Sequence, residues 1–257
     1  MSTVETSLRI AVVTGAAQGM GESIALRLAE DGLDVVVNDL PTKSEQLKAV
    51  VKRIEAKGRR AIAVPGDVSS EEYVKALVGK TVETFGSLDV MVANAGVMVS
   101  KPMLETTSGD IDLVCSVNGK GLFWCFKYAA LQMIKQGRGG RIIGASAGDG
   151  KRAAANMGAY SGSKFAARGI IQSCASEWAK HKITVNGYAP GVILTPTTLH
   201  ADDTNNGGSV STAKKFAGSP LDVPQTEPTV IASFVSYLAK PESFFITGQC
   251  INVDGGL

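Results

Sequence analysis

Tyr160 and Lys164 carry the clearest chemical signal in the sequence, as the first and last residues of the segment Tyr160-Ser161-Gly162-Ser163-Lys164. The segment opens a stretch of helical periodicity, where residues four apart lie on one face, one turn from each other. A neighbouring ammonium favours the phenolate and lowers the pKa of a tyrosine from its usual value of about 10. The pair therefore predicts a general acid/base. Exposed helix surface is the alternative for so common a spacing.

A glycine-rich segment, Thr14 to Gly21 (TGAAQGMG), lies between a predicted first strand and a predicted first helix. Glycines let the backbone turn sharply and approach a pyrophosphate, and a helix N-terminus offers unpaired N–H groups and the positive end of its dipole. In this context the pattern predicts a dinucleotide-binding loop. The residues expected to contact the dinucleotide here are Gly15, Gln18, Gly19, Met20 and Gly21.

Asp39 follows the second predicted strand, where an acidic side chain can accept hydrogen bonds from the hydroxyls of an adenosine ribose. The same carboxylate would repel a 2′-phosphate. No arginine follows Asp39 directly, and Gln18 rather than a basic residue stands in the glycine loop. We therefore expect NAD instead of NADP, with Lys43 as the residue most able to reverse the preference. A plain turn residue is the alternative role for Asp39.

The elements that must position these residues alternate along the chain between strand-like and helix-like patterns, as in successive βαβ units. The strand-like runs are 9–14, 35–38, 61–64, 88–93, 141–144, 184–188 and 250–253. The helical patterns lie at 21–31, 43–57, 71–85, 111–135, 160–180 and 226–238. We predict a single α/β domain over residues 1–257, a doubly wound parallel sheet of Rossmann type with about seven strands and helices on both faces.

Residues 195–227 interrupt this alternation, because Pro, Gly, Asn, Asp, Ser and Thr accumulate there. A long segment without secondary structure inside a compact domain is usually a functional lid or a disordered insertion. We favour a mobile lid over the substrate.

Three further motifs follow predicted strands in order: Gly66-Asp67-Val68, Asn94-Ala95-Gly96, and Pro190-Gly191 with Thr195. Together with the TGxxxGxG loop and the Tyr160–Lys164 pair, they resemble the short-chain dehydrogenase/reductase family over about residues 9–256. Within that family, the segments 160–169, 183–196 and 234–256 look most like acetoin/diacetyl reductases and 2,3-butanediol dehydrogenases.

The resemblance implies an NAD(H)-dependent oxidoreductase that interconverts a small ketone and its secondary alcohol. Tyr160 would exchange a proton with the carbonyl oxygen, and Lys164 would also bind the nicotinamide ribose. Further cofactor contacts are implied at Asp67, Val68, Asn94, Ala95, Gly96, Pro190, Gly191, Ile193 and Thr195. A homotetramer joined by the long helices and C-terminal segments is implied as well. The expected pocket lining is mostly apolar and could hold a ketone larger than acetoin; it comprises Met98, Asn156, Met157, Ile193 and 197–225.

Asn118 matches the family's helix asparagine, which supports a water-mediated proton relay to the lysine. It lies in an apolar stretch, where a buried polar side chain needs a partner. A structural hydrogen bond is therefore the alternative role.

One position departs from the family pattern. The family usually has a serine thirteen residues before the tyrosine, where its hydroxyl polarises the substrate carbonyl, but Ala147 stands there and Ser146 is the nearest hydroxyl. Adjacent strand residues face opposite ways, so Ser146 would need a bulge or a shifted loop to serve. Three alternatives stay open: Ser146 substitutes, the chain is a serine-to-alanine variant with weak reductase activity, or the chemistry needs no such donor.

Two other functions stay open at this point. The scaffold could perform a non-redox dehydration or isomerisation, or the chain could be an NAD-binding regulatory protein without turnover. The presence of Asn118, Tyr160 and Lys164 disfavours the second.

Composition argues against several other classes. A formal net charge of +2 over 257 residues is too small for a nucleic-acid surface. No apolar run approaches the roughly 18 to 20 residues that span a bilayer, and residues 1–6 lack the pattern of a secretion signal. Neither the four cysteines nor the two histidines show metal-ligand spacing. We expect a cytoplasmic protein without metal, nucleic-acid or membrane partners, and with buried free thiols.

Overall fold

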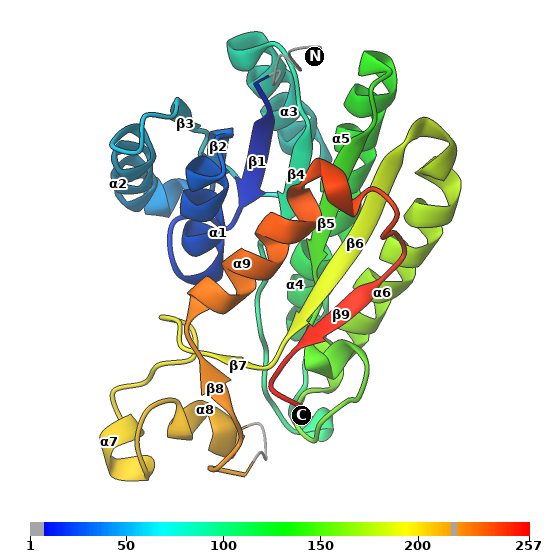
Figure 1. Cartoon of the computed structure of the whole chain (residues 1–257). Coiled ribbons are helices and arrows are strands. Elements are labelled where there is room, and N and C mark those ends of the chain that lie inside the picture. The colour runs from blue at the N-terminus through cyan, green and yellow to red at the C-terminus, as the bar shows by residue number, and fades with distance from the viewer. Residues whose placement is uncertain (1–7, 217–219) are drawn as a thin grey trace.

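Seven parallel strands form the central sheet, in the order β3-β2-β1-β4-β5-β6-β9, in the computed structural model, which describes residues 8–216 and 220–257 (Figure 1). They are β1 (Ile10–Thr14), β2 (Asp34–Asn38), β3 (Ala61–Ala63), β4 (Val90–Ala93), β5 (Gly140–Ala145), β6 (Ile183–Pro190) and β9 (Cys250–Val253). Connections run in opposite directions from β1 and β4, so the carboxyl ends of these strands flank the crevice where such sheets bind ligands. The predicted Rossmann-type sheet is confirmed.

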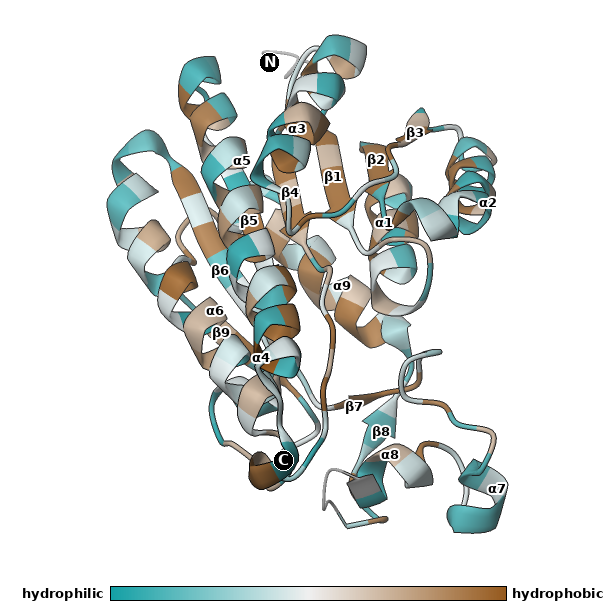
Figure 2. Cartoon of the chain, turned by 180° about the vertical axis from the view of Figure 1, so that it is seen from behind, coloured by the Kyte–Doolittle hydropathy of each residue, from teal (hydrophilic) through white to brown (hydrophobic). Residues whose placement is uncertain are grey.

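Helices cover both faces of this sheet. On one face lie α1 (Gly19–Glu30), α2 (Ser44–Glu55) and α9 (Pro228–Ala239); on the other lie α3 (Glu71–Phe85), α4 (Ser108–Val114), α5 (Leu122–Gln136) and α6 (Gly158–Trp178). Successive strand residues alternate between the two cores: Ala11 and Val13 belong to one, Val12 to the other. In Figure 2 the strands are mostly hydrophobic, whereas the helices alternate between both colours, as amphipathic helices do.

Short 3₁₀ turns are η1 (Pro41–Lys43), η2 (Met103–Glu105), η4 (Gly148–Gly150), η5 (Ala179–His181) and η6 (Pro241–Ser243).

The helix predicted over 111–135 is interrupted by a π-helical segment, η3 (Cys115–Gly121), between α4 and α5. At Gly121 a Cβ atom would lie 3.0 Å from Cγ2 of Val68, so the segment packs closely on the loop after β3. π-helical turns of this kind occur often at functional sites. Periodicity alone does not reveal such a turn, because its side chains continue the apolar pattern of the flanking helices.

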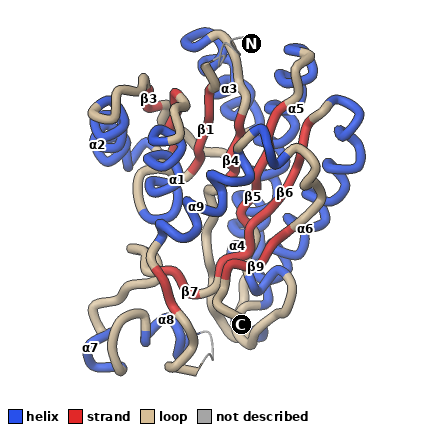
Figure 3. Tube along the Cα trace, in the orientation of Figure 1, coloured by secondary structure: helices blue, strands red, loops and turns tan. Residues whose placement is uncertain are grey.

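A small lobe extends beyond the carboxyl ends of the strands (Figure 3). It contains β7 (Val192–Ile193), α7 (Asp203–Asn206), α8 (Ser211–Phe216) and β8 (Gln225–Thr226), and β7 pairs in parallel with β8. The composition had indicated no regular structure here. Residues 200–212 of this lobe are organised around the buried carboxylate of Asp203, which accepts hydrogen bonds from the main-chain N–H groups of His200, Val210 and Thr212 at 2.9–3.0 Å.

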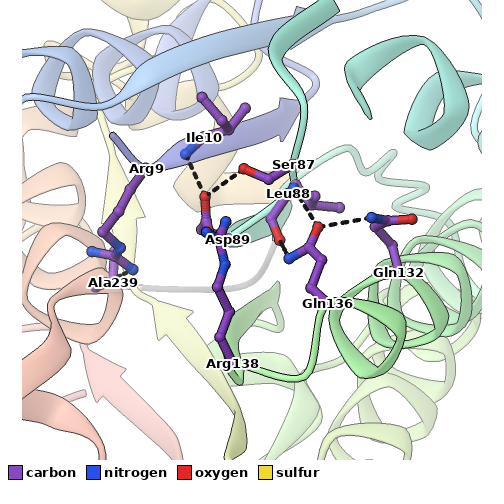
Figure 4. A network of polar contacts seen from close by, with 9 residues as sticks. All are labelled: Arg9, Ile10, Ser87, Leu88, Asp89, Gln132, Gln136, Arg138 and Ala239. Carbon is purple, nitrogen blue, oxygen red and sulfur yellow. Dashed lines mark hydrogen bonds and ion pairs between the residues drawn. The ribbon is translucent and has the colours of Figure 1, made fainter. Parts of the chain in front are cut away.

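The amino-terminal edge of the sheet is closed by a network of polar contacts (Figure 4). Oδ2 of Asp89 accepts hydrogen bonds from the N–H of Ile10 (2.9 Å) and the hydroxyl of Ser87 (3.1 Å), and its other oxygen accepts one from Arg138. Gln136 pairs with both main-chain polar groups of Leu88. The polar groups of Asp89, Leu88 and Gln136 thus satisfy one another. In the described part of the chain, no helix is long and apolar enough to cross a membrane.

Candidate active site

A cleft of about 1030 Å³ opens at the carboxyl ends of the strands, and residues of the small lobe such as His200 and Lys214 contribute to its lining. With one exception, every residue predicted to act in catalysis or cofactor binding lines this cleft; the exception, Asn118, lies buried behind it. The cleft therefore brings together segments from both halves of the sheet. Of the expected pocket lining, Met98, Met157 and Ile193 face it, and Asn156 does not.

The glycine loop forms one wall of the cleft. Gly15 and Gly19 have φ angles of +64° and +60°, in the left-handed region that favours glycine. A Cβ atom on Gly21 would lie 2.0 Å from the carbonyl oxygen of Gly15, so the turn closes only without a side chain there. The side chain of Gln18, which precedes α1, makes no capping hydrogen bond, and the N–H groups at the start of that helix are left for an anion.

Asn94 holds this loop from behind. Its amide nitrogen donates to the carbonyl oxygens of Thr14 (2.9 Å) and Gly15 (3.1 Å), and its oxygen accepts a hydrogen bond from the hydroxyl of Tyr188 (2.7 Å). The resemblance implied a cofactor contact for Asn94; the structure assigns its side chain a bracing role. Tyr188, fully buried in β6, is a supporting residue that sequence reasoning missed, because it reads as one more apolar strand position.

Asp39 lies at the end of β2, beside the glycine loop. Its carboxylate accepts hydrogen bonds from the N–H groups of Ala17 (3.1 Å) and Leu40 (2.8 Å), which fixes its orientation at the edge of the cleft. Lys43 donates to the side-chain oxygen of Gln18 (3.4 Å). The predicted ribose contact of Asp39 stays a prediction, and the position of the carboxylate is compatible with it.

Tyr160 and Lys164 lie one turn apart on α6, and both line the cleft. The lysine is buried, and its ammonium donates to the carbonyl oxygen of Ala145 (3.0 Å) and lies 5.7 Å from the centre of the Tyr160 ring. Burial lowers the pKa of Lys164 to about 8. The pair is thus assembled by the fold, with the lysine held at the end of β5.

The expected lowering of the Tyr160 pKa is not found in this structure. Burial raises the pKa of the phenol above its usual value, and the negative charge of Asp149 raises it further. The net shift is upward although the ammonium of Lys164, which donates to Ala145, lies 5.7 Å from the centre of the ring. Tyr160 is therefore held as a neutral phenol.

Asn118 is buried in the π-helical segment η3. Its side-chain oxygen accepts a hydrogen bond from the N–H of Val97 (2.9 Å), and its amide nitrogen donates to the carbonyl oxygen of Val97 (2.9 Å) and to the hydroxyl of Ser163 (2.9 Å). Ser163 in turn donates to the carbonyl oxygen of Tyr160 (2.6 Å). Asn118 thus makes the structural hydrogen bonds proposed as its alternative role; its part in a proton relay stays a prediction.

Comparison with known proteins agrees with this geometry. Residues 9–206 match the family model described as short chain dehydrogenase. The chain belongs to the short-chain dehydrogenase family.

A short-chain dehydrogenase/reductase of Armillaria gallica is 43% identical to this chain, over 100% of the chain and 98% of that protein. The L-2,3-butanediol dehydrogenase of Corynebacterium glutamicum is 36% identical, over 97% of this chain and 98% of that protein. The crystal structure of a short-chain dehydrogenase from Mycobacterium paratuberculosis bound to NAD superposes with a TM-score of 0.87 at 32% identity. That match covers 96% of this chain and 97% of the other.

Ser146 and Ala147 of this short-chain dehydrogenase lie where the family usually has the serine that polarises the substrate carbonyl. The hydroxyl of Ser146 is buried and donates to the carbonyl oxygen of Lys164 (3.2 Å), and Ala147 lines the cleft with its methyl group. The shift that would turn Ser146 toward a substrate is therefore not observed, and its assignment as a carbonyl donor stays a prediction. Asp149, two residues further on, also lines the cleft and was not singled out from the sequence.

Replacing Lys164 by Met should stabilise the fold at neutral pH. Below pH 8 the lysine is charged in both the folded and the unfolded chain, so the folded state carries the full penalty of burying it. One unit of pKa corresponds to about 1.4 kcal/mol, and the variant also loses the hydrogen bond to Ala145. We expect Lys164→Met to raise the free energy of unfolding at pH 7 by about 1–3 kcal/mol.

This difference in the free energy of unfolding between variant and wild type should decrease as the pH rises. The decrease begins at about pH 8, where Lys164 in the folded chain loses its proton, and ends above the ordinary lysine pKa of 10.5, where the side chain is neutral in both states. Urea unfolding at a series of pH values measures it, with the exposed Lys52→Met as the control. A difference from wild type that stays constant across this range would contradict the burial of a titrating amine.

Proposed function

We propose that this short-chain dehydrogenase transfers hydride between NAD(H) and a small ketone or its secondary alcohol. One observation supports this most directly: the phenol of Tyr160 and the ammonium of Lys164 line the same cleft as a glycine loop whose helix N-terminus carries no side-chain cap. No observation favours the non-redox alternative. The NAD-bound relative from Mycobacterium paratuberculosis supports the choice of cofactor.

The residues of the cleft fit a dinucleotide. The loop that Gly15 and Gly21 keep free of side chains would hold the pyrophosphate, and the carboxylate of Asp39 would accept hydrogen bonds from the adenosine ribose. At Gly96 a Cβ atom would lie 3.3 Å from Nζ of Lys164, so the missing side chain keeps space beside the catalytic pair for the nicotinamide end. The segment from Pro190 to Thr195 lines the cleft there and would complete the site.

The bound nicotinamide supplies the hydride for reduction or accepts it during oxidation. Tyr160 would donate its phenolic proton to the carbonyl oxygen as the alcohol forms, and would take a proton back in the reverse direction. The phenol is protonated near neutral pH and is therefore available as the proton donor for reduction. Lys164 would stabilise the phenolate left after proton transfer and would bind the nicotinamide ribose.

Several finer assignments are proposals of the same kind. The butanediol dehydrogenase of Corynebacterium glutamicum supports a substrate related to acetoin. Free thiols suit a cytoplasmic location, since reducing compartments keep cysteines unpaired. All four cysteines are free thiols, but Cys115 is exposed, whereas we had expected buried thiols. Exposed apolar side chains such as Phe123 on α5 and Phe165 on α6 support the proposed homotetramer, which the particle mass in solution will test. The role of residues 195–227 as a lid also stays a proposal.

Tyr160→Phe tests the proton donor. The variant keeps the aromatic ring and its packing but has no proton to give, so we expect turnover of acetoin or diacetyl with NADH to fall by at least about 10²-fold. NADH binding, followed by fluorescence titration, should stay within about threefold of wild type, because the cofactor contacts are retained. Comparable turnover by the variant would show that Tyr160 is not the proton donor.

Asp39 should make the enzyme prefer NADH. A 2′-phosphate would meet the carboxylate at short range, so we expect kcat/KM with NADH to exceed that with NADPH by about tenfold or more. Asp39→Ser should narrow the difference by removing the repulsion. Equal efficiency of the two cofactors with wild-type enzyme would mean that Lys43 outweighs the carboxylate.

Ala147 and Ser146 can be separated by a pair of variants. Ala147→Ser would place a hydroxyl on the cleft wall; if the reaction lacks only a carbonyl donor, kcat should rise by tens-fold or more, toward the ~10²–10³ expected for one such donor. Ser146→Ala removes a hydroxyl that is bonded to the main chain of α6, so its effect on kcat should be small. A severe loss with Ser146→Ala and none gained with Ala147→Ser would show that Ser146 has taken over the role. No change in either would show that no serine hydroxyl acts here.

A further inference from the structure

A second cavity lies at the edge of the sheet opposite the cleft, at the amino ends of β1 and β2. Its volume is about 660 Å³, and its walls come from the starts of these strands and from the ends of α1 and α9. Among the described residues that line it, Arg9, Arg59 and Lys240 are cationic and Asp31 is the only acid. The proposed oxidoreductase function does not use this cavity.

The acids at this edge of the sheet are already paired with other cations. Each of these carboxylates has its charge balanced, so it is not free to balance a further cation that lines the cavity. The pairs are Asp31 with Arg27, Asp34 with Arg59 and Arg60, and Asp89 with Arg138.

Arg9 and Lys240 are half-buried in the wall of the cavity, and neither forms an ion pair within the described part of the chain. Nη2 of Arg9 donates to the carbonyl oxygen of Ala239 (2.7 Å), as Figure 4 shows. The ammonium of Lys240 donates no hydrogen bond to any described residue. Both cations therefore keep donors for a molecule in the cavity.

A third unpaired cation lies behind this wall. Arg141 is buried near the start of β5, and its guanidinium donates to the main-chain carbonyl groups of Gly140, Lys240 and Pro241 at 2.9–3.2 Å. Burial lowers the pKa of both Arg9 and Arg141, and the charge of Arg9 lowers that of Arg141 further. The two guanidinium groups thus repel each other in a partly desolvated place.

The ends of α1 and α9 offset only part of this positive charge. A helix C-terminus carries about half an elementary negative charge, so the two ends together balance about one of the three unpaired cations. An excess of about two positive charges is left at the cavity. Partly desolvated charges of this kind are costly unless an anion accompanies them.

The size and lining of the cavity restrict that anion. Arginine and lysine both bind phosphate groups, and a phosphate dianion matches the excess charge. The cavity is much larger than one phosphate group, and apolar side chains form part of its wall, among them Leu8, Leu33 and Pro241. A phosphate group attached to a small organic skeleton fits these properties.

We propose that this cavity is an anion-binding site for a phosphate monoester, whose phosphate group contacts Arg9 and Lys240. The site lies at the opposite edge of the sheet from the cleft, and the inference does not depend on the proposed oxidoreductase function. A phosphate bound there joins the start of β1 to the end of α9. It binds the folded chain alone and therefore stabilises it.

Calorimetric titration with inorganic phosphate tests the site, at constant ionic strength and at a slightly alkaline pH where phosphate is mainly a dianion. Lys240→Gln and Arg9→Gln should each weaken phosphate binding by about 10- to 100-fold, the loss expected for a charge-assisted hydrogen bond. Arg9→Lys keeps the charge and should lose less. Phosphate should also raise the Tm of the wild-type protein more than that of Lys240→Gln.

Two controls separate this site from other anion binding. Lys52→Gln removes an exposed charge on α2 and should leave the phosphate affinity unchanged. Phosphate bound at the glycine loop of the cleft would instead be displaced by NADH and would not respond to Lys240→Gln. Acetate, a monoanion, should bind at least about tenfold more weakly than phosphate, because it balances only one charge.

The inference is overturned if the wild-type protein binds no phosphate at millimolar concentrations, or if both charge-removing variants bind it as tightly as wild type. Acetate binding as tight as that of phosphate would overturn the assignment to a phosphate group. If Arg9→Gln fails to fold, Lys240→Gln decides alone, since the side chain of Lys240 makes no hydrogen bond or ion pair within residues 8–216 and 220–257. None of these outcomes changes the proposed hydride transfer in the cleft.

Discussion

The ammonium group of Lys164 is the constraint on which the site depends, because it must be held at the end of a buried strand, where no carboxylate among the described residues forms an ion pair with it. Its hydrogen bond to Ala145 ties α6 to β5, and Ser146 bonds back to the main chain of Lys164. Asn118, through Ser163, connects the same helix to the π-helical segment. Each bond uses a buried polar group that would otherwise be unsatisfied. The catalytic pair is therefore positioned by polar contacts that also join β5, η3 and α6.

A second set of contacts positions the cofactor wall. The hydroxyl of Thr14 accepts hydrogen bonds from the N–H groups of Asn94 and Ala95, and Asn94 joins the glycine loop to Tyr188 on β6. These residues come from β1, β4 and β6, the strands around the crevice of the sheet. The shape of the loop is thus set by neighbouring strands and by the absence of side chains at its glycines. Preorganisation of this kind reduces the entropy lost when a cofactor binds.

The sequence predicted the central sheet, most of its helices and a set of site residues of which nearly all line the cleft, because apolar periodicity and glycine spacing are local properties of the chain. Among the features that escaped it, four have clear non-local causes. The π turn at Asn118 depends on a partner in the loop after β4. The order of the small lobe depends on Asp203, whose three N–H donors appear only once the segment is folded. The raised pKa of Tyr160 reflects burial, and the position of Asp149 depends on packing against α6.

Ala147 and Asp149 together restrict the order in which a hydride and a proton can be transferred in the cleft. A carbonyl that received hydride before a proton would become an alkoxide near the charge of Asp149, with only a methyl group on the wall at Ala147. Repulsion between two negative charges is strong in a site of low dielectric constant. Proton transfer from Tyr160 must then occur together with hydride transfer. It can do so because the phenol is a stronger acid than the alcohol that forms. Catalysis in this cleft therefore depends more on the proton donor than it would in a cleft that also offers a hydroxyl to the developing oxyanion. The positive charge of Lys164 then stabilises the phenolate that Tyr160 becomes.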